Sequence, residues 1–143
     1  MASDFTLRLC SLNVRGLRAD KKRKKMFKNF NDDKFNCICL QETHVTDDVI
    51  DVWKREWNGE IVYNSFTERS CGQMILLKKS CNFQCTVICN TTRILAINSN
   101  NEDINTLIVN IYAPNNNLEK QIFFAELTEK VNEWNLTYDN NLT

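Results

Sequence analysis

Five short segments between residues 60 and 114 carry the pattern that most restricts the fold of this 143-residue chain. In each segment apolar residues dominate or alternate with polar ones, and a polar or glycine-containing turn separates it from the next. A period of two is the pattern of β-strands, so we expect this part of the chain to form β-sheet. The segments are EIVYNS (60–65), GQMILLKK (72–79), FQCTVICN (83–90), RILAIN (93–98) and TLIVNIYAP (106–114).

The part of the chain before these segments predicts two strand–helix units. FTLRLCSLN (5–13) alternates like a strand and ends at the glycine-containing VRGL. Residues 19–30 then place Ala19, Met26, Phe27 and Phe30 near one helical face, and the basic residues 21–25 are expected to cover the others. This predicts a basic helix whose lysines and arginine face solvent.

The second unit begins with FNCICLQ (35–41), a short apolar run that predicts a buried strand. Asp47 and Asp48 favour the start of a helix, and Gly59 is expected to end it. The apolar residues of this helix have spacings of three and four, which predicts a core-facing stripe of Val49, Val52, Trp53 and Trp57.

The C-terminal segment predicts a loop over residues 115–117 and a closing helix. Its core-facing stripe is expected to contain Ile122, Phe123, Leu127, Val131 and Trp134. Helices before and after a set of strands indicate an α/β protein with layered packing, and the length is that of one domain.

Composition narrows the functional classes. Eighteen basic and eighteen acidic residues give a formal net charge of zero, so any attraction to nucleic acid has to be local. No apolar run approaches the length of a membrane span, so we expect no membrane partner. MASDFTLRL at the N-terminus lacks the basic region and apolar core of a secretory signal, which predicts an intracellular protein, nuclear or cytoplasmic.

The seven cysteines are an odd number and are scattered along the chain. Only Cys37 and Cys39 lie close together, and the four-residue spacing of Cys81, Cys85 and Cys89 is not a usual zinc pattern. Buried free thiols in a reducing compartment are therefore expected, and neither disulfides nor a zinc site is.

Three polar residues stand where predicted strands end, namely Asn13, Glu42 and Tyr112. Ligand sites of layered α/β proteins favour such strand ends, and an amide, a carboxylate and a phenol together can hold a hard cation and a phosphate. Mg²⁺ needs only one or two carboxylates, because waters and phosphate oxygens complete its octahedron. Each residue also has a simpler interpretation. Asn13 could be a turn residue, Glu42 a solvent-exposed loop carboxylate, and Tyr112 a strand tyrosine whose hydroxyl faces solvent.

Three strings that contain these residues occur in a characteristic order: SLNVRGL (11–17), CLQETH (39–44) and NIYAPN (110–115). Together with the glycine-led CGQMILLKKS (71–80) they resemble the endonuclease/exonuclease/phosphatase superfamily. They are most similar to the apurinic-type endonuclease domain of LINE-type (non-LTR) retrotransposons. The resemblance runs from about residue 5 to about residue 134, so residues 1–143 are interpreted as part of such a domain.

The resemblance implies a DNase-I-like fold, a two-sheet β-sandwich flanked by helices, with its C-terminal portion missing. It also implies a phosphodiesterase site that uses Mg²⁺ or Mn²⁺ and acts on DNA. In that family the glutamate that matches Glu42 ligates the metal. The asparagine that matches Asn13 helps to hold the phosphate and the attacking water, and the tyrosine that matches Tyr112 contacts the phosphate.

Further residues are candidates for contact with nucleic acid. Arg15 follows Asn13 closely and is expected to contact a backbone phosphate. His44 of the QETH string is usual in retrotransposon members but is not the catalytic histidine of the family; it is a candidate for a phosphate or metal-shell contact, or else a loop residue. Asn115, at the end of NIYAPN, is a further candidate. The basic run 21–25 fits a solvated helix face, a DNA contact or a nuclear-localisation signal.

Complete members of the family also carry a Gly-Asp-x-Asn turn and a Ser-Asp-His motif, and neither occurs in this sequence. Only about half of the catalytic set is therefore present, so the chain alone is expected to be inactive and to leave apolar sheet surface uncovered. The missing C-terminal half of its own domain is therefore a candidate partner. The alternatives are a non-catalytic transposon-derived remnant, a nucleic-acid or protein binding module, and an unrelated small α/β domain.

Overall fold

The computed structural model describes residues 5–65 and 71–139. The elements in chain order are β1 (Leu9–Asn13), α1 (Asp20–Asp32), β2 (Cys37–Gln41), α2 (Ile50–Glu56), β3 (Gly59–Asn64), β4 (Gln73–Lys78), the short 3₁₀ turn η1 (Lys79–Cys81), β5 (Gln84–Asn90), β6 (Ile94–Asn100), β7 (Asn105–Ile111) and α3 (Asn117–Asp139). The predicted strands and helices are all present, with ends that differ by a few residues. Residues 1–4, which belong to the stretch that argues against a secretory signal, lie outside the described residues.

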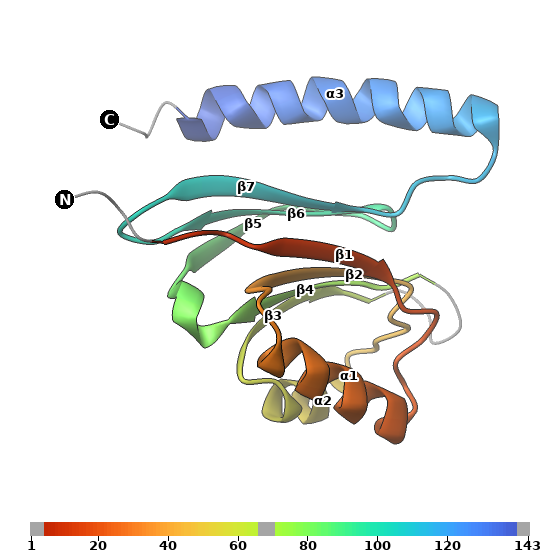
Figure 1. Cartoon of the computed structure of the whole chain (residues 1–143). Coiled ribbons are helices and arrows are strands. Elements are labelled where there is room, and N and C mark those ends of the chain that lie inside the picture. The colour runs from red at the N-terminus through yellow and green to blue at the C-terminus, as the bar shows by residue number, and fades with distance from the viewer. Residues whose placement is uncertain (1–4, 66–70, 140–143) are drawn as a thin grey trace.

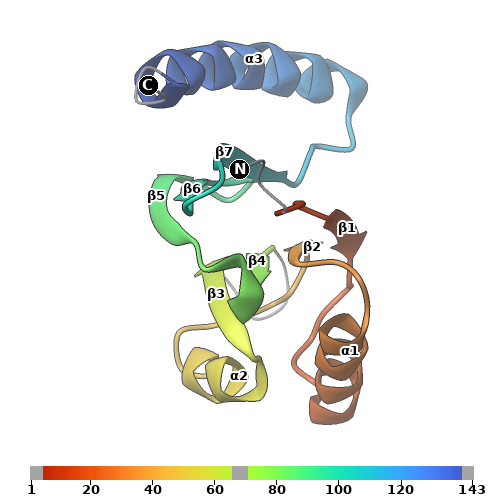
Figure 2. The same ribbon diagram turned by 60° about the vertical axis from the view of Figure 1, so that its left-hand side comes forward.

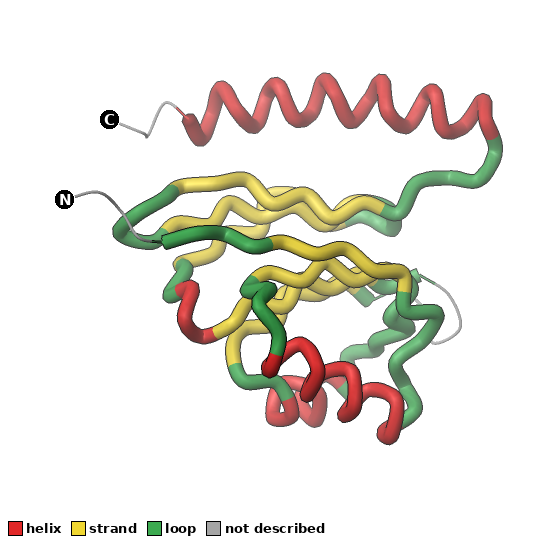
Figure 3. Tube along the Cα trace, in the orientation of Figure 1, coloured by secondary structure: helices red, strands yellow, loops and turns green. Residues whose placement is uncertain are grey.

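The strands form two sheets, one with the order β1-β2-β4-β3 and one with the order β5-β6-β7. Helices α1 and α2 cover one face of the four-stranded sheet, and the three-stranded sheet lies over its other face (Figures 1 and 2). Helix α3 lies across the outer side of the three-stranded sheet, so that two strand layers stand between helices (Figure 3). The chain is therefore α/β, and its two facing sheets are compatible with the predicted sandwich.

Two apolar clusters hold these layers together. Strand β2 is buried along its whole length and contributes to both, because its side chains alternate between the two faces of the sheet. Ile38 and Leu40 pack with the helices, whereas Cys37 and Cys39 pack between the sheets. Trp53 and Trp57 of the predicted stripe are buried in the cluster under the helices, as expected.

Two predictions about α1 and α2 are wrong. Arg23 was expected on the solvent face with the neighbouring lysines, but it is only 1% exposed. It lies on the same helical face as Phe27 and Phe30, four and seven residues further on, and so points toward α2. Val52 of the second stripe is 42% exposed, because α2 presents Ile50 and Trp53 to the core instead.

The stripe of α3 is less buried than predicted. Phe123, Leu127, Val131 and Trp134 are only half-buried, and Ile122 is 52% exposed. Helix α3 lies beside the three-stranded sheet, and no other element of the described chain covers its opposite side (Figure 2). Apolar surface is also open at the edge strand β1, where Leu9 is 47% and Leu12 41% exposed.

All seven cysteines carry free thiols, and three of them, Cys37, Cys39 and Cys81, are buried. A hydrogen bond with Cys39, together with burial, raises the pKa of the Cys37 thiol, which keeps it protonated and unreactive. Within the described part of the chain, none of the helices combines the length and the low polarity that crossing a bilayer requires.

Candidate functional site

The predicted polar residues meet at one edge of the sheets. Strands β1 and β2 are parallel, and their register pairs Asn13 with Gln41, so Asn13 and Glu42 lie at the same strand ends. Tyr112 follows β7 of the other sheet. Its hydroxyl donates a hydrogen bond to Glu42 Oε1 at 2.5 Å, across seventy residues of chain. The structure thus brings the carboxylate and the phenol into contact, beside the end of the strand that carries the amide.

The backbone of Glu42 explains how its side chain reaches the phenol. Gln41 faces the three-stranded sheet, so strict alternation would turn Glu42 toward the helices. Glu42 instead has a φ of 55°, a left-handed conformation that costs a non-glycine residue about 1 kcal/mol or more. Its carbonyl oxygen accepts a hydrogen bond from Gly16 N at 2.6 Å, which holds the turn in place.

Three loops at this edge are joined through their backbones. Leu17 N donates to Thr43 O, and Thr43 N donates to Gly72 O, each at 3.0 Å. Left-handed φ values recur here in Arg15, His44 and Cys71 besides Glu42. Such strained residues cluster where a structure needs a defined loop geometry, so the loops at this edge have a tightly specified conformation.

Glycine is required where these loops approach each other. A Cβ on Gly16, whose φ is 91°, would lie 2.9 Å from His44 Nδ1. A Cβ on Gly72 would lie 2.7 Å from Thr43 Oγ1. The glycine of VRGL therefore does more than end a strand, because it lets the imidazole of His44 pack against the loop that follows Asn13.

The surroundings of Tyr112 keep its hydroxyl protonated. The hydrogen bond to Glu42, with added contributions from burial and from the carboxylate charge, raises the pKa of Tyr112. The guanidinium of Arg93 lies 5.6 Å from the centre of the phenol ring and opposes this shift. Arg93 Nη1 also donates to the carbonyl oxygen of Tyr112 at 3.0 Å, so a cation is fixed beside the carboxylate–phenol pair.

We predict a pH-dependent cost for Tyr112→Phe. Because the pKa of Tyr112 is higher in the folded chain than the ordinary value of 10.0, its hydrogen bond stabilises the fold at every pH below that value and is lost as pH rises through the folded pKa. Near neutral pH the substitution should lower the free energy of unfolding by about 1 kcal/mol. Urea titrations of both proteins should show that this difference in unfolding free energy disappears at strongly alkaline pH. A difference that does not depend on pH would mean that the hydroxyl does not bind Glu42.

Asn13 and Arg15 take up positions on the loop after β1. Asn13 Oδ1 accepts a hydrogen bond from Arg15 N at 3.1 Å, so the turn role considered for Asn13 is observed. Lys22 of the basic run reaches back from α1, and its Nζ donates to Val14 O at 2.6 Å. Arg15 is exposed at the rim. The loop is therefore braced by a helix that also carries positive charge to the edge of the site.

His44 and Asn115 differ in their relation to the carboxylate. His44 is half-buried against Gly16, two residues after Glu42. Asn115 is exposed three residues after Tyr112, and none of the hydrogen bonds described for the chain joins it to Asn13, Glu42 or Tyr112. The sequence placed both near the site, but only His44 is packed into its loops.

The donor atoms at this edge suit a hard divalent cation. A carboxylate has two oxygens, so Glu42 can accept the phenol hydrogen at one and offer the other to a cation. The amide oxygen of Asn13 is a second oxygen donor at the neighbouring strand end. In the part of the chain that the structure describes, no three His, Cys, Asp or Glu side chains are grouped so as to hold a metal. The residues fit a weak site of the Mg²⁺ type, in which waters and a phosphate supply most ligands.

Sequence reasoning missed three contributors to the site: Arg93, Gln41 and Asn110. Arg93 precedes β6, and only the fold places it beside Tyr112. Gln41 and Asn110 are 9% and 2% exposed, and their side chains are hydrogen-bonded to each other between the sheets. Their sequence signal was a polar residue at an inward position of an otherwise apolar strand.

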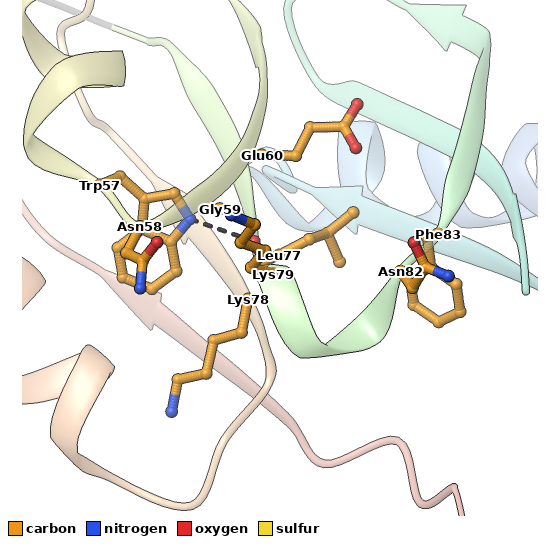
Figure 4. A pocket seen from close by; sticks show the side chains of 9 residues that line it. All are labelled: Trp57, Asn58, Gly59, Glu60, Leu77, Lys78, Lys79, Asn82 and Phe83. Atoms are coloured by element: carbon orange, nitrogen blue, oxygen red, sulfur yellow. Dashed lines mark hydrogen bonds between the residues drawn. The ribbon is translucent and has the colours of Figure 1, made fainter.

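A separate pocket of about 430 Å³ lies at the other end of β3 and β4, where Gly59 pairs with Lys78 (Figure 4). Lys78 and Glu60 point away from each other in this view, and Trp57 Nε1 donates to Leu77 O at 3.2 Å. Asn13, Glu42 and Tyr112 do not line it. Its polar side chains, among them Glu60, Lys78 and Asn82, do not point toward one another in this view, whereas Tyr112 and Glu42 are hydrogen-bonded at the opposite strand ends.

Comparison with known proteins gives one informative similarity. No model of a known protein family matches the chain. Over 128 residues, or 87% of its length, the chain is 29% identical to a Xenopus laevis protein described as the uncharacterized 149 kDa protein of transposon TX1. The chain spans 10% of the length of that protein. Over most of its own length, it is therefore similar to one segment of a much longer transposon protein.

Proposed function

We propose that this chain carries the N-terminal part of a divalent-metal-dependent phosphodiesterase site, and that the activity is that of a DNA endonuclease of a non-LTR retrotransposon. The contact between Tyr112 and Glu42 is the observation that carries the proposal. It joins two of the three strings that resemble the endonuclease/exonuclease/phosphatase superfamily, at the strand end where the third string places Asn13. The similarity to a protein of transposon TX1 agrees with this origin.

Each residue has a defined part in the proposed site. Glu42, with Asn13, would hold Mg²⁺ or Mn²⁺, and the bound cation would neutralise charge on the phosphate and on the leaving oxygen. Tyr112, kept protonated, can transfer its one hydrogen bond from Glu42 to a phosphate oxygen when the substrate binds. Arg15 at the rim, and His44 packed into the loops beside it, would contact the DNA backbone through their cationic and hydrogen-bonding groups. Asn115 is a more distant candidate for the same contact.

The proposed site is incomplete within this sequence. Neither Gly-Asp-x-Asn nor Ser-Asp-His occurs in it, so the groups that orient the water and the leaving oxygen in the family have to come from elsewhere. Residues of a catalytic set act as a unit, and loss of several members leaves little rate enhancement. The chain alone is therefore expected to be inactive, and the open apolar surface at β1 and α3 fits a partner segment.

The test is a chimera in which residues 5–134 replace the matching segment of an active LINE-type endonuclease domain that supplies both motifs. We expect Mg²⁺-dependent nicking of supercoiled plasmid, reduced by about 100-fold or more in Glu42→Gln. Glu60→Gln, at the far end of β3, is the matched control and should nick normally. The chain alone should not nick above its own Glu42→Gln variant.

Two results would count against the proposal. A folded chimera that fails to nick, or that nicks equally well as Glu42→Gln, would indicate a non-catalytic remnant or a binding module. Nicking by the chain alone that disappears in Glu42→Gln would show that the two motifs are not required. Circular dichroism separates a misfolded chimera from an inactive one.

A further inference from the structure

A ladder of buried amide side chains connects the two sheets immediately behind the candidate site. Gln41, Asn64, Gln73 and Asn110 are each at most 9% exposed. Gln73 Nε2 donates to Asn110 O at 2.8 Å, and Asn64 Nδ2 donates to Gln73 Oε1 at 3.1 Å. The ladder thus crosses from β7 through β4 to β3, in a space that is filled mainly by aliphatic side chains and thiols.

Asn110 is the central member, and its side chain makes three hydrogen bonds. Its Oδ1 accepts from Gln41 Nε2 at 2.7 Å. Its Nδ2 donates to Leu40 O at 2.9 Å and to Met74 O at 3.1 Å. Leu40 and Met74 are opposite each other in the register of β2 and β4. One amide of β7 is therefore hydrogen-bonded to two neighbouring strands of the other sheet.

The position of Asn110 connects these hydrogen bonds to the candidate site. Asn110 precedes Tyr112 by two residues, and side chains two apart on a strand point to the same face. Gln41 directly precedes Glu42. The hydrogen bond between Asn110 and Gln41 therefore joins the two chain segments that carry the phenol and the carboxylate, one step behind the place where these two meet.

We propose that Asn110, acting through Gln41, is a positioning residue that sets the register of β7 against β2 and thereby holds the hydroxyl of Tyr112 on Glu42. The role in catalysis rests on the proposed function, whereas the positioning itself does not. Aliphatic contacts between sheets have no fixed direction and tolerate sliding. Hydrogen bonds of defined length between buried amides do not, so they select one register.

The measurement is the Cζ chemical shift of Tyr112 near neutral pH, which reports the hydrogen bond of the hydroxyl, recorded by carbon NMR of ring-labelled tyrosine and assigned with Tyr112→Phe. Glu42→Gln removes the carboxylate and defines the full change of this chemical shift. Asn110→Leu and Gln41→Leu should each produce at least half of that change. If Asn110→Leu does not fold, Gln41→Leu decides, because it leaves the bonds from Asn110 to the two carbonyls intact.

Asn64→Ala is the matched control, because Asn64 is as buried as Asn110 and belongs to the same ladder, but its described hydrogen bonds go to neither Asn110 nor Gln41. It should lower stability and leave the Tyr112 chemical shift unchanged. The inference is overturned if folded Gln41→Leu keeps the wild-type chemical shift, if Asn64→Ala changes it as much, or if Glu42→Gln itself has no effect on it. Failure of the chimera to nick would leave the NMR result standing and would refute only the endonuclease.

Discussion

Replacing Arg23 with alanine is expected to lower the free energy of unfolding by about 3–5 kcal/mol, the cost of removing one partner from a buried ion pair. The Arg23 side chain is 2% exposed, and that of Glu56 on α2 is 15% exposed. Arg23 Nε and Nη2 each donate to a different carboxylate oxygen of Glu56 at 2.8 Å. The substitution would leave the carboxylate of Glu56 without this partner in a place where little water can reach it.

Other contacts of Arg23 add to this cost. Its Nη1 donates to Leu17 O and to Arg18 O at 3.1 Å, and its guanidinium lies 4.9 Å from the centre of the Trp53 ring. One side chain therefore fastens α1, α2 and the loop after β1 together. A lysine could not reproduce the paired bonds to Glu56, so Arg23→Lys is expected to be destabilising as well.

Urea unfolding with Lys24→Ala as the matched control provides the test. Lys24 is the next residue in the same basic run but is exposed, so its loss should change the free energy by less than about 0.5 kcal/mol. The double variant Arg23→Met with Glu56→Leu should recover most of the loss, because it removes both charges together. A cost below about 1 kcal/mol for Arg23→Ala would mean that the pair is open to solvent.

Gly59→Ala is expected to lower the free energy of unfolding by about 3 kcal/mol or more. Gly59 has a φ of 156°, and a Cβ there would lie 2.0 Å from Leu77 O and 2.9 Å from Trp57 Nε1. It would enter the space between the indole N–H and the carbonyl that accepts its hydrogen bond (Figure 4). Leu77 O belongs to the backbone of β4 and cannot move without disturbing the pairing of β3 and β4.

Thermal and urea unfolding of Gly59→Ala can be compared with Asn58→Ala, an exposed neighbour whose loss should have little effect. Fluorescence of the buried tryptophans should also shift in Gly59→Ala, because Trp57 loses its carbonyl partner. An unchanged unfolding midpoint would show that the end of β3 can relax away from β4. The candidate site lies at the opposite strand ends, so this variant affects stability without touching Glu42.

Much of the fold followed from periodicity because strands with one apolar face and helices with one apolar stripe have few ways to bury both. The segments at 60–65, 72–79, 83–90, 93–98 and 106–114 all became strands. The extent to which α3 is buried could not be predicted from periodicity. The same stripe of Phe123, Leu127 and Trp134 would occur in a helix that is fully covered and in one that is half-covered. Periodicity shows which side of a helix is apolar, and the neighbouring layers determine how far it is buried.

Arg23 shows the limit of reading charge as exposure. It stands among lysines, and composition alone assigns all of them to solvent. Its spacing to Phe27 and Phe30 was the available signal, because residues four and seven apart share a helical face. The matching carboxylate, Glu56, lies thirty-three residues away, and only the packing of α1 on α2 brings it near.

The sequence predicted which strand ends contribute to the candidate site, but not how their side chains are arranged. Parallel strands β1 and β2 bring Asn13 and Glu42 to one edge, in agreement with the expectation that residues at these strand ends lie together. The meeting of Glu42 with Tyr112 depends on a left-handed turn and on the register between two sheets. Neither leaves a pattern in the sequence, because both depend on residues far apart in the chain: the turn on Gly16, and the register on residues about seventy positions apart.

The central claim is that Glu42 seats a divalent cation beside Tyr112, and paramagnetic relaxation by Mn²⁺ tests it most directly. Titrated into the isotope-labelled chain, Mn²⁺ should broaden the NMR signals of Asn13, Thr43 and Tyr112 first. Glu42→Gln should abolish this broadening, and Glu60→Gln should leave it unchanged. Broadening centred on another carboxylate, or broadening of the same signals that survives Glu42→Gln, would contradict the account.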